Sequence, residues 1–285
     1  MRQSGVIVLC LGSVFALSAC QGNSDAQVQR ALKDVNVIDE SNLNDVMLSV
    51  ADPEEAVTYF TRTLEQNPGR IDLMRGLAKS LVRADKPTEA SLVWRQVAEH
   101  PEATPDDKVM LADALIRSNL WDEAKTELAT IPPTHESFDR YRLEAMVADY
   151  DKNWTKADSF YEIAAGLTTT PAGVLNNWGY SKLTRGDYPG AEKLFTEALT
   201  YDPTKFTAKN NLVMARAAQR KYDLPVVHMT QEERAQLLYT MALAAIKQGD
   251  TAVGKGLLQN AIDTSPQYFE AAVRSLDALD ANAAL

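Results

Sequence analysis

A few residues of this chain are of types that do covalent or metal chemistry, and their spacing argues against most of it. His135 and Glu136 begin a pattern typical of zinc proteases, but the second histidine is missing because Asp139 stands in its place. Gly254 and Gly256 flank a lysine, yet no strand precedes them as a phosphate-binding loop requires. No nucleophile, base and oxyanion donor are gathered in one place. We therefore interpret the chain as a non-enzyme without a cofactor or metal.

The two cysteines, Cys10 and Cys20, both lie within the first twenty residues. A disulfide framework or a cysteine-based zinc site is therefore excluded for the rest of the chain. Arg2, an apolar run over residues 5–16 and small residues before Cys20 form the three-part pattern of a secretory signal peptide. The apolar run is shorter than the roughly 20 residues that a membrane-spanning helix needs. An uncleaved anchor helix is the alternative.

The tetrapeptide Leu17-Ser18-Ala19-Cys20 resembles the lipobox of bacterial lipoproteins. The resemblance implies cleavage after Ala19 and attachment of acyl chains such as palmitate to Cys20, and Gln21 favours the outer membrane. Each buried CH₂ contributes about 0.8 kcal/mol, so two or three acyl chains would make the attachment stable. We predict a signal peptide over residues 1–19, a lipidated tether and degenerate first helix over 20–51, and a repeat array over 52–285. The alternative for Cys20 is a stray thiol at a signal boundary.

Composition limits the classes of protein further. The chain has 285 residues, of which 45% are hydrophobic, and a formal net charge of −10. This apolar content is enough for a buried core, so the composition argues against wholesale disorder. The acidic balance argues against nucleic-acid binding, which needs clustered lysine and arginine.

From residue 52 onward, apolar residues recur at helical spacing. Helix starts are marked by Asp52 before Pro53, by Thr104 before a proline and two acidic residues, and by Thr230 with Glu233 as a capping box. Each expected helix runs for roughly a dozen residues before the next break. The pattern predicts an all-α protein.

Residues 174–203, VLNNWGYSKLTRGDYPGAEKLFTEALTYDP, resemble the tetratricopeptide repeat (TPR). Gly179, Ala191, Phe195 and Pro203 fall at its signature positions, and Trp178 replaces the usual leucine. Other repeats follow at a spacing of about 34 residues. The sixth repeat is distorted, because Pro225 stands where a small alanine belongs, and residues 268–279 form a terminal capping helix. The resemblance implies a TPR solenoid, a right-handed superhelix of antiparallel hairpins whose concave surface binds peptides or partner domains.

The concave positions of the fifth and sixth repeats are the candidate binding site. An asparagine amide offers both a donor and an acceptor, so paired asparagines on adjacent helices can hold an extended peptide. Ordinary polar lining is the alternative, because Lys209 and Arg216 beside them match the full peptide clamp of the family poorly. For Trp94 and Trp178 we predict a packing role. The candidate partner-binding residues are Asn176, Asn177, Tyr180, Asn210, Asn211 and Met214.

A lipobox followed by about seven repeats, together with the run NNWGYSKLTRGDYPGAEKLF, resembles the TPR lipoproteins of tight-adherence (Tad/Flp) pilus systems. The resemblance implies an outer-membrane scaffold that faces the periplasm and helps the pilus secretin to assemble or localise, as pilotins do. Its partners would be the secretin or other pilus components and the membrane, through the lipid anchor. The alternative is an envelope adaptor that recruits a peptidoglycan hydrolase or protease.

Overall fold

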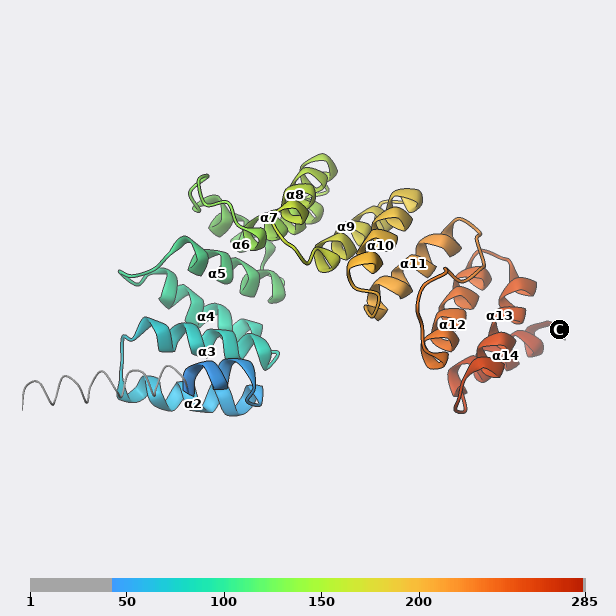
Figure 1. The fold of residues 1–285 in the computed structure, drawn as a ribbon, viewed down its shortest axis with the longest axis horizontal. Coiled ribbons are helices and arrows are strands. Elements are labelled where there is room, and N and C mark those ends of the chain that lie inside the picture. Colours follow the sequence, from blue (N-terminus) through green and yellow to red (C-terminus); the bar gives the residue numbers. More distant parts are fainter. Residues whose placement is uncertain (1–42, 284–285) are drawn as a thin grey trace, which may run out of the picture. The chain divides into compact units, whose positions relative to one another are not determined.

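The computed structural model describes residues 43–283, and every regular element among them is a helix (Figure 1). The predicted all-α fold is confirmed. The signal peptide, Ala19, Cys20 and residues 20–42 of the predicted tether lie outside the described residues. The described residues form two compact units, residues 43–103 and residues 104–283, and each is considered by itself. No helix among residues 43–283 is long and apolar enough to cross a membrane.

The first unit contains a helix over residues 43–49, then α2 (Pro53–Gln66), α3 (Ile71–Arg83) and α4 (Pro87–Ala98). The predicted cap is confirmed, since the Asp52 carboxylate accepts hydrogen bonds from the first backbone amides of α2. Phe60 and Trp94 are buried between the helices, and Trp94 is only 2% exposed, which confirms its packing role. Arg83 donates to the Met47 and Ala51 carbonyls, at 2.8 and 2.7 Å, and so holds the first helix on α3.

The second unit is also built from pairs of consecutive helices that pack on each other. A Thr104 capping box opens α5, and a Thr230 capping box opens α12, as the sequence predicted. Helix α14 is the predicted capping helix, and it packs on α13. The helices of this unit are α5 (Pro105–Arg117), α6 (Trp121–Ala129), α7 (Phe138–Tyr150), α8 (Trp154–Gly166), α9 (Ala172–Thr184), α10 (Tyr188–Tyr201), α11 (Phe206–Ala218), α12 (Gln231–Lys247), α13 (Thr251–Thr264) and α14 (Glu270–Ala283).

One turn geometry recurs after the first helix of each pair. A residue with positive φ stands two positions after the helix, and the next amide donates back to a carbonyl in the last helical turn, as in a Schellman motif. At Gly186, for example, φ is 85°, and the Asp187 amide donates to the Lys182 carbonyl at 2.9 Å. The positive-φ residues of these turns are Asp85, Asn119, Lys152, Gly186, Arg220 and Gly249.

The sixth repeat keeps this turn but loses its second helix. Arg220 has φ of 58°, and the Lys221 amide donates to the Arg216 carbonyl at 3.1 Å. In the other pairs, the amide of the fourth residue of the second helix donates to the backbone carbonyl four positions earlier. The donor residues are Ala90, Ala124, Ala157, Ala191 and Gly254. Pro225 occupies this position, has no N–H and clashes with the carbonyl that should accept. Helix formation therefore stops at the turn.

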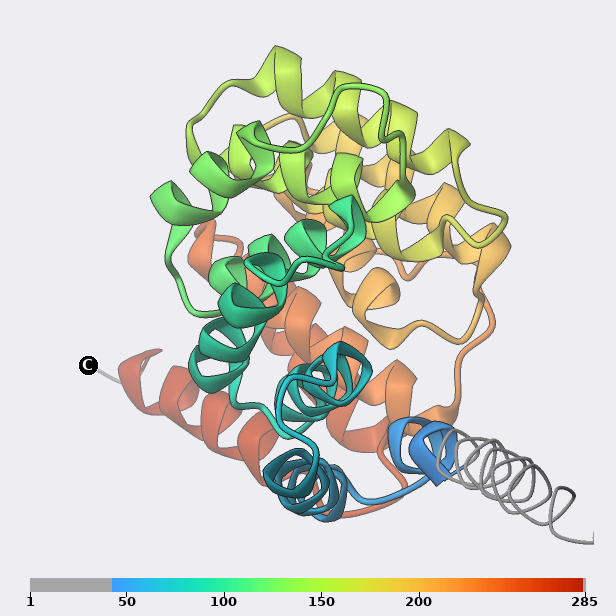
Figure 2. The ribbon, with the colours of Figure 1, turned by 90° about the vertical axis from the view of Figure 1, so that its left-hand side faces the viewer.

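An irregular segment, residues 219–230, takes the place of the missing helix and leads to α12 (orange in Figure 1 and Figure 2). Tyr222, Leu224 and Met229 pack on the core that α12 and α13 share, while Val227 packs on the core of α10 and α11. The segment thus connects α11 to α12, and these two helices pack directly on each other.

Candidate protein-binding groove

A groove of about 800 Å³ lies in the second unit. Its walls are α7, α9 and α11, which are the first helices of three successive repeats, and residues from α6 and α8 complete it. This is the face that the TPR resemblance assigned to partners. Ligand pockets in proteins are typically about 300–1,000 Å³ and mainly apolar, so the groove is large enough to hold part of a peptide.

The structure brings five of the six predicted residues together in this groove: Asn176, Asn177, Tyr180, Asn210 and Asn211. Met214 does not line it, and its sulfur lies 3.7 Å from the side-chain nitrogen of Asn210 one turn earlier on α11. Lys209 is buried at 1% exposure, and Arg216 binds Glu192 at 2.8 Å, so neither flanking cation lines the groove.

Two of the asparagines bond to each other across the helices. Asn211 Nδ2 donates to Asn176 Oδ1 at 3.1 Å, which links α11 to α9. The Thr240 hydroxyl donates to Asn210 Oδ1 at 2.9 Å, whereas the Asn177 side chain makes no hydrogen bond to another described residue. Each amide can make about four hydrogen bonds, so these residues support the fold and keep capacity for a client backbone. Their role in partner binding stays a prediction.

The sequence analysis missed the aromatic character of the groove. The rings of Trp121 and Tyr150 stack with centroids 4.8 Å apart and planes 7° apart. Tyr150 and Tyr180 are each 53% exposed, so both rings keep surface that a partner can contact. A signal was present, because several of these rings stand at the first or last position of a helix, beside a turn. The aromatic lining comprises Trp121, Phe138, Tyr150, Trp154, Tyr161, Tyr180 and Phe206.

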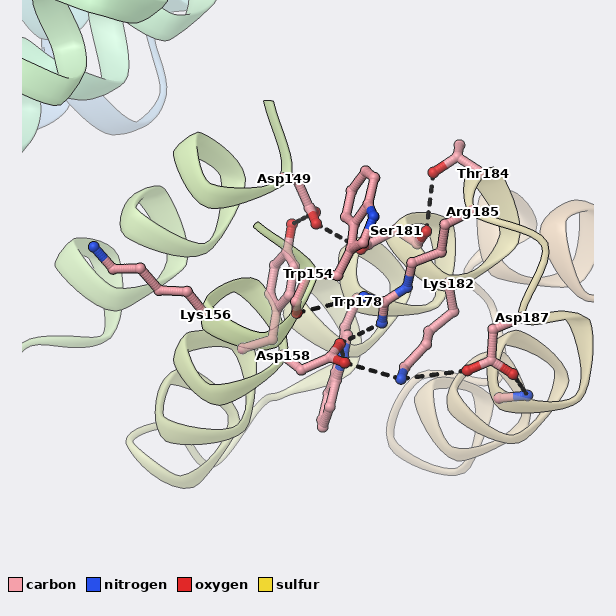
Figure 3. A network of polar contacts seen from close by, with 12 residues as sticks. Asp149, Trp154, Lys156, Asp158, Trp178, Ser181, Lys182, Thr184, Arg185 and Asp187 are labelled. Atoms are coloured by element: carbon pink, nitrogen blue, oxygen red, sulfur yellow. Dashed lines mark hydrogen bonds and ion pairs between the residues drawn. The ribbon is translucent and has the colours of Figure 1, made fainter. Parts of the chain in front are cut away.

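The groove also contains an unusual carboxylate, Asp149. It accepts hydrogen bonds from the Tyr161 hydroxyl at 2.8 Å and the Ser181 hydroxyl at 2.6 Å (Figure 3). Burial raises the pKa of Asp149, and the two hydroxyl donors, together with the charge of Arg185, offset the increase only in part. Arg185 itself forms its ion pair with Asp158. Two cations line the groove, Arg142 and Lys205, which is the N-cap residue of α11. Arg142 is already bound by Asp113 and Asp139 at 3.0 and 3.1 Å.

A neighbouring carboxylate, Asp158, has the opposite environment (Figure 3). It accepts from Trp178 Nε1 at 2.6 Å, from Arg185 at 2.5 Å and from Lys182 at 3.0 Å. Burial alone would raise the pKa of Asp158, but these hydrogen bonds outweigh it and the pKa lies below its usual range. Trp178 is thus half-buried and held by a hydrogen bond, in agreement with a packing role. Asp158 thus has two cationic hydrogen-bond donors within the chain, whereas both donors to Asp149 are neutral.

Comparison with known proteins supports this description of the fold. The family model for the tetratricopeptide repeat matches residues 176–224. No curated protein sequence matches the chain.

Solved structures match over most of the length. The APC/C hetero-tetramer Cut9–Hcn1 aligns with a TM-score of 0.60 and 13% identity, over 83% of this chain and 48% of that one. A TPR protein from Parabacteroides merdae aligns with a TM-score of 0.53 and 13% identity, over 87% and 95%. The C-terminal part of a TPR repeat-containing protein from Cytophaga hutchinsonii aligns with 0.52 and 16%, over 82% and 98%. This chain spans about half the length of the first of these, 48%. The likenesses show the fold, an all-α TPR solenoid.

Proposed function

We propose that this chain is a lipid-anchored scaffold that captures a segment of a client protein in the groove of its second unit. TPR solenoids are scaffolds for protein–protein interaction, and stacked repeats create extended binding surfaces. The observation that carries the proposal is the groove itself, about 800 Å³, in which exposed aromatic rings and amide side chains meet on three successive first helices. Aromatic residues are the ones most often responsible for affinity at protein interfaces.

The lipobox at Cys20 and the likeness of the fifth repeat to TadD, the TPR lipoprotein of Tad/Flp pilus systems, support a particular setting. In it, the chain is held on the periplasmic face of the outer membrane and assists assembly or localisation of the pilus secretin. Confinement of scaffold and client to one membrane raises their effective concentration, so modest affinity in the groove suffices.

The anchor is tested by replacing Cys20 with alanine. We expect the variant to leave the outer-membrane fraction and appear in the soluble periplasmic fraction, because no acyl chain is attached, and pilus assembly to fall. Membrane fractionation and mass spectrometry of the mature N-terminus measure this. The matched control is Cys10→Ala, which changes a cysteine inside the predicted signal peptide and should alter neither location nor assembly. If the Cys20 variant stays in the outer membrane and pili assemble normally, the anchoring proposal is wrong.

The groove is tested by replacing Tyr180 with alanine in a tagged full chain. Because an exposed aromatic at the centre of an interface contributes strongly to affinity, we expect at least about a tenfold loss of secretin co-isolated from solubilised envelopes. Tyr201→Ala is the control, since Tyr201 is similarly exposed, 56% against 53%, and does not line the groove. Equal recovery with both variants would contradict client capture by this groove. A peptidoglycan hydrolase or protease in place of the secretin would point to the adaptor alternative.

A further inference from the structure

Asp149 differs from its neighbour Asp158, which is also half-buried, in having no ion pair with a cation. Asp158 binds Arg185 and Lys182, whereas the two hydrogen-bond donors to Asp149 are neutral hydroxyls. A carboxylate has about four acceptor sites, so Asp149 keeps capacity for further donors. Removing a carboxylate from water is unfavourable unless charged or hydrogen-bonding groups compensate. This residue is therefore incompletely compensated within the chain, and it lines the groove.

The surroundings of Asp149 suit a positive charge. Trp154 and Tyr161 line the same groove, as do the stacked rings of Trp121 and Tyr150. Cations are attracted to the faces of such rings within about 6 Å of the centroid. The chain itself provides an example, because the Arg185 guanidinium lies 5.5 Å from the centroid of the Trp154 ring. Arg142 does not fill this role for Asp149, since two other carboxylates bind it. Lys205 also lines the groove, and no ion pair joins it to Asp149 among the described residues.

We propose that the groove selects client segments that carry an arginine or lysine side chain, which enters between the aromatic rings and pairs with Asp149. This inference rests on the proposed function and specifies the chemistry of the client. The charge-assisted hydrogen bond replaces the water that Asp149 lost on burial, and charge-assisted bonds are about twice as strong as neutral ones. The formal net charge of −10 attracts basic segments toward the chain as a whole.

The test compares two labelled peptides on the purified full chain. Both are heptapeptides with a tyrosine on each side of the central residue, which is arginine in one and citrulline, its uncharged near-isostere, in the other. We expect the arginine peptide to bind at least about tenfold more tightly, measured by fluorescence polarisation, because a hydrogen bond to a charged partner is stronger. Equal affinities, or no binding of the arginine peptide at millimolar concentration, would overturn the inference without any variant being made.

Asp149→Asn then assigns the preference to one residue. The Tyr161 and Ser181 hydroxyls donate to different oxygens of Asp149, so asparagine keeps one of these acceptors, and its amide nitrogen can donate to the other hydroxyl. Because the substitution also removes the buried charge, we expect thermal melting to stay close to that of the unchanged chain. We expect the preference for arginine over citrulline to disappear in this variant. Asp277→Asn on α14 removes the same charge from an exposed position outside the groove and should leave the preference intact. A well-folded Asp149 variant that keeps the tenfold preference would overturn the assignment.

Client capture by the groove and selection of a cationic side chain by Asp149 can be contradicted independently of each other. If secretin recovery depends on Tyr180 but arginine and citrulline peptides bind equally, the groove captures clients without selecting a cation. If Tyr180→Ala does not change secretin recovery, client capture by the groove fails whatever the peptides do.

Discussion

Replacing Gly179 with valine is expected to lower the free energy of unfolding of the second unit by about 3 kcal/mol, because overpacking a tight core costs about 1–3 kcal/mol and a branched side chain is at the upper end. A Cβ at this position would lie 2.7 Å from Cε1 and 2.8 Å from Cδ1 of Phe195. Phe195 on α10 is fully buried, so its ring has no space to move into. For a unit of this size the loss corresponds to a fall in melting temperature of about 6–12 °C.

The control is Gly173→Val in the same helix. Gly173 has no heavy atom within 4 Å of an added Cβ, so the substitution should change stability by no more than about 0.5 kcal/mol. Urea unfolding followed by circular dichroism measures both variants. Combining Gly179→Val with Phe195→Leu should recover part of the loss, since the two side chains are in contact and their effects do not add. If the two glycine variants are equally stable, close approach of α9 and α10 is not what requires glycine.

The steric rules of the fold could be predicted from the sequence because they are local and periodic. Gly179 and Phe195 are separated by a fixed interval within one repeat, and Thr104 and Thr230 act on the backbone a few residues away. The distortion of the sixth repeat could also be predicted, since Pro225 stands where a small alanine belongs. The structure adds that the second helix is lost, because proline has no amide donor for it. What replaces that helix was not visible, because the packing of Tyr222 and Val227 depends on cores from different repeats.

The groove was predictable in position but only partly in chemistry. Asn176 and Asn211 were placed on one face by their positions in successive repeats, yet their mutual hydrogen bond depends on how α9 and α11 approach each other. Trp121 and Tyr150 stack although they belong to α6 and α7 of different repeats. The position of Asp149 within its repeat does not reveal whether its partners are charged or neutral. Repeat periodicity therefore predicts faces, and contacts between repeats decide the chemistry of those faces.

A buried ion pair joins α11 to α12 at the point where the sixth repeat lacks its second helix. The Lys209 ammonium lies 3.0 and 2.9 Å from the two carboxylate oxygens of Glu233. The Lys209 side chain is 1% exposed and that of Glu233 is 20% exposed. Glu233 also closes the capping box with Thr230, whose amide donates to it at 2.8 Å. Burial would raise the pKa of Glu233, but the Thr230 amide and Lys209 outweigh it and lower the pKa.

The unequal burial predicts unequal consequences of removing each partner. Glu233→Ala should cost about 3–5 kcal/mol, because it leaves the Lys209 ammonium buried without a counter-charge. Lys209→Met should cost no more than about 1 kcal/mol, because an apolar side chain of similar volume fills the space and often equals a buried ion pair in stability. Glu233 then keeps its bond to the Thr230 amide and reaches water through its exposed fraction.

Urea unfolding of the full chain measures the two variants and their combination. The double variant should be more stable than Glu233→Ala alone, because methionine removes the stranded charge and only the loss of the cap, about 1 kcal/mol, remains. Comparable losses in the two single variants would show that the pair stabilises by attraction alone and that burial of Lys209 is not decisive. The predicted asymmetry follows from where the pair lies. Glu233 is at the start of α12, after the irregular segment, and keeps part of its surface exposed, whereas Lys209 lies on α11, which packs against both α10 and α12, and is buried.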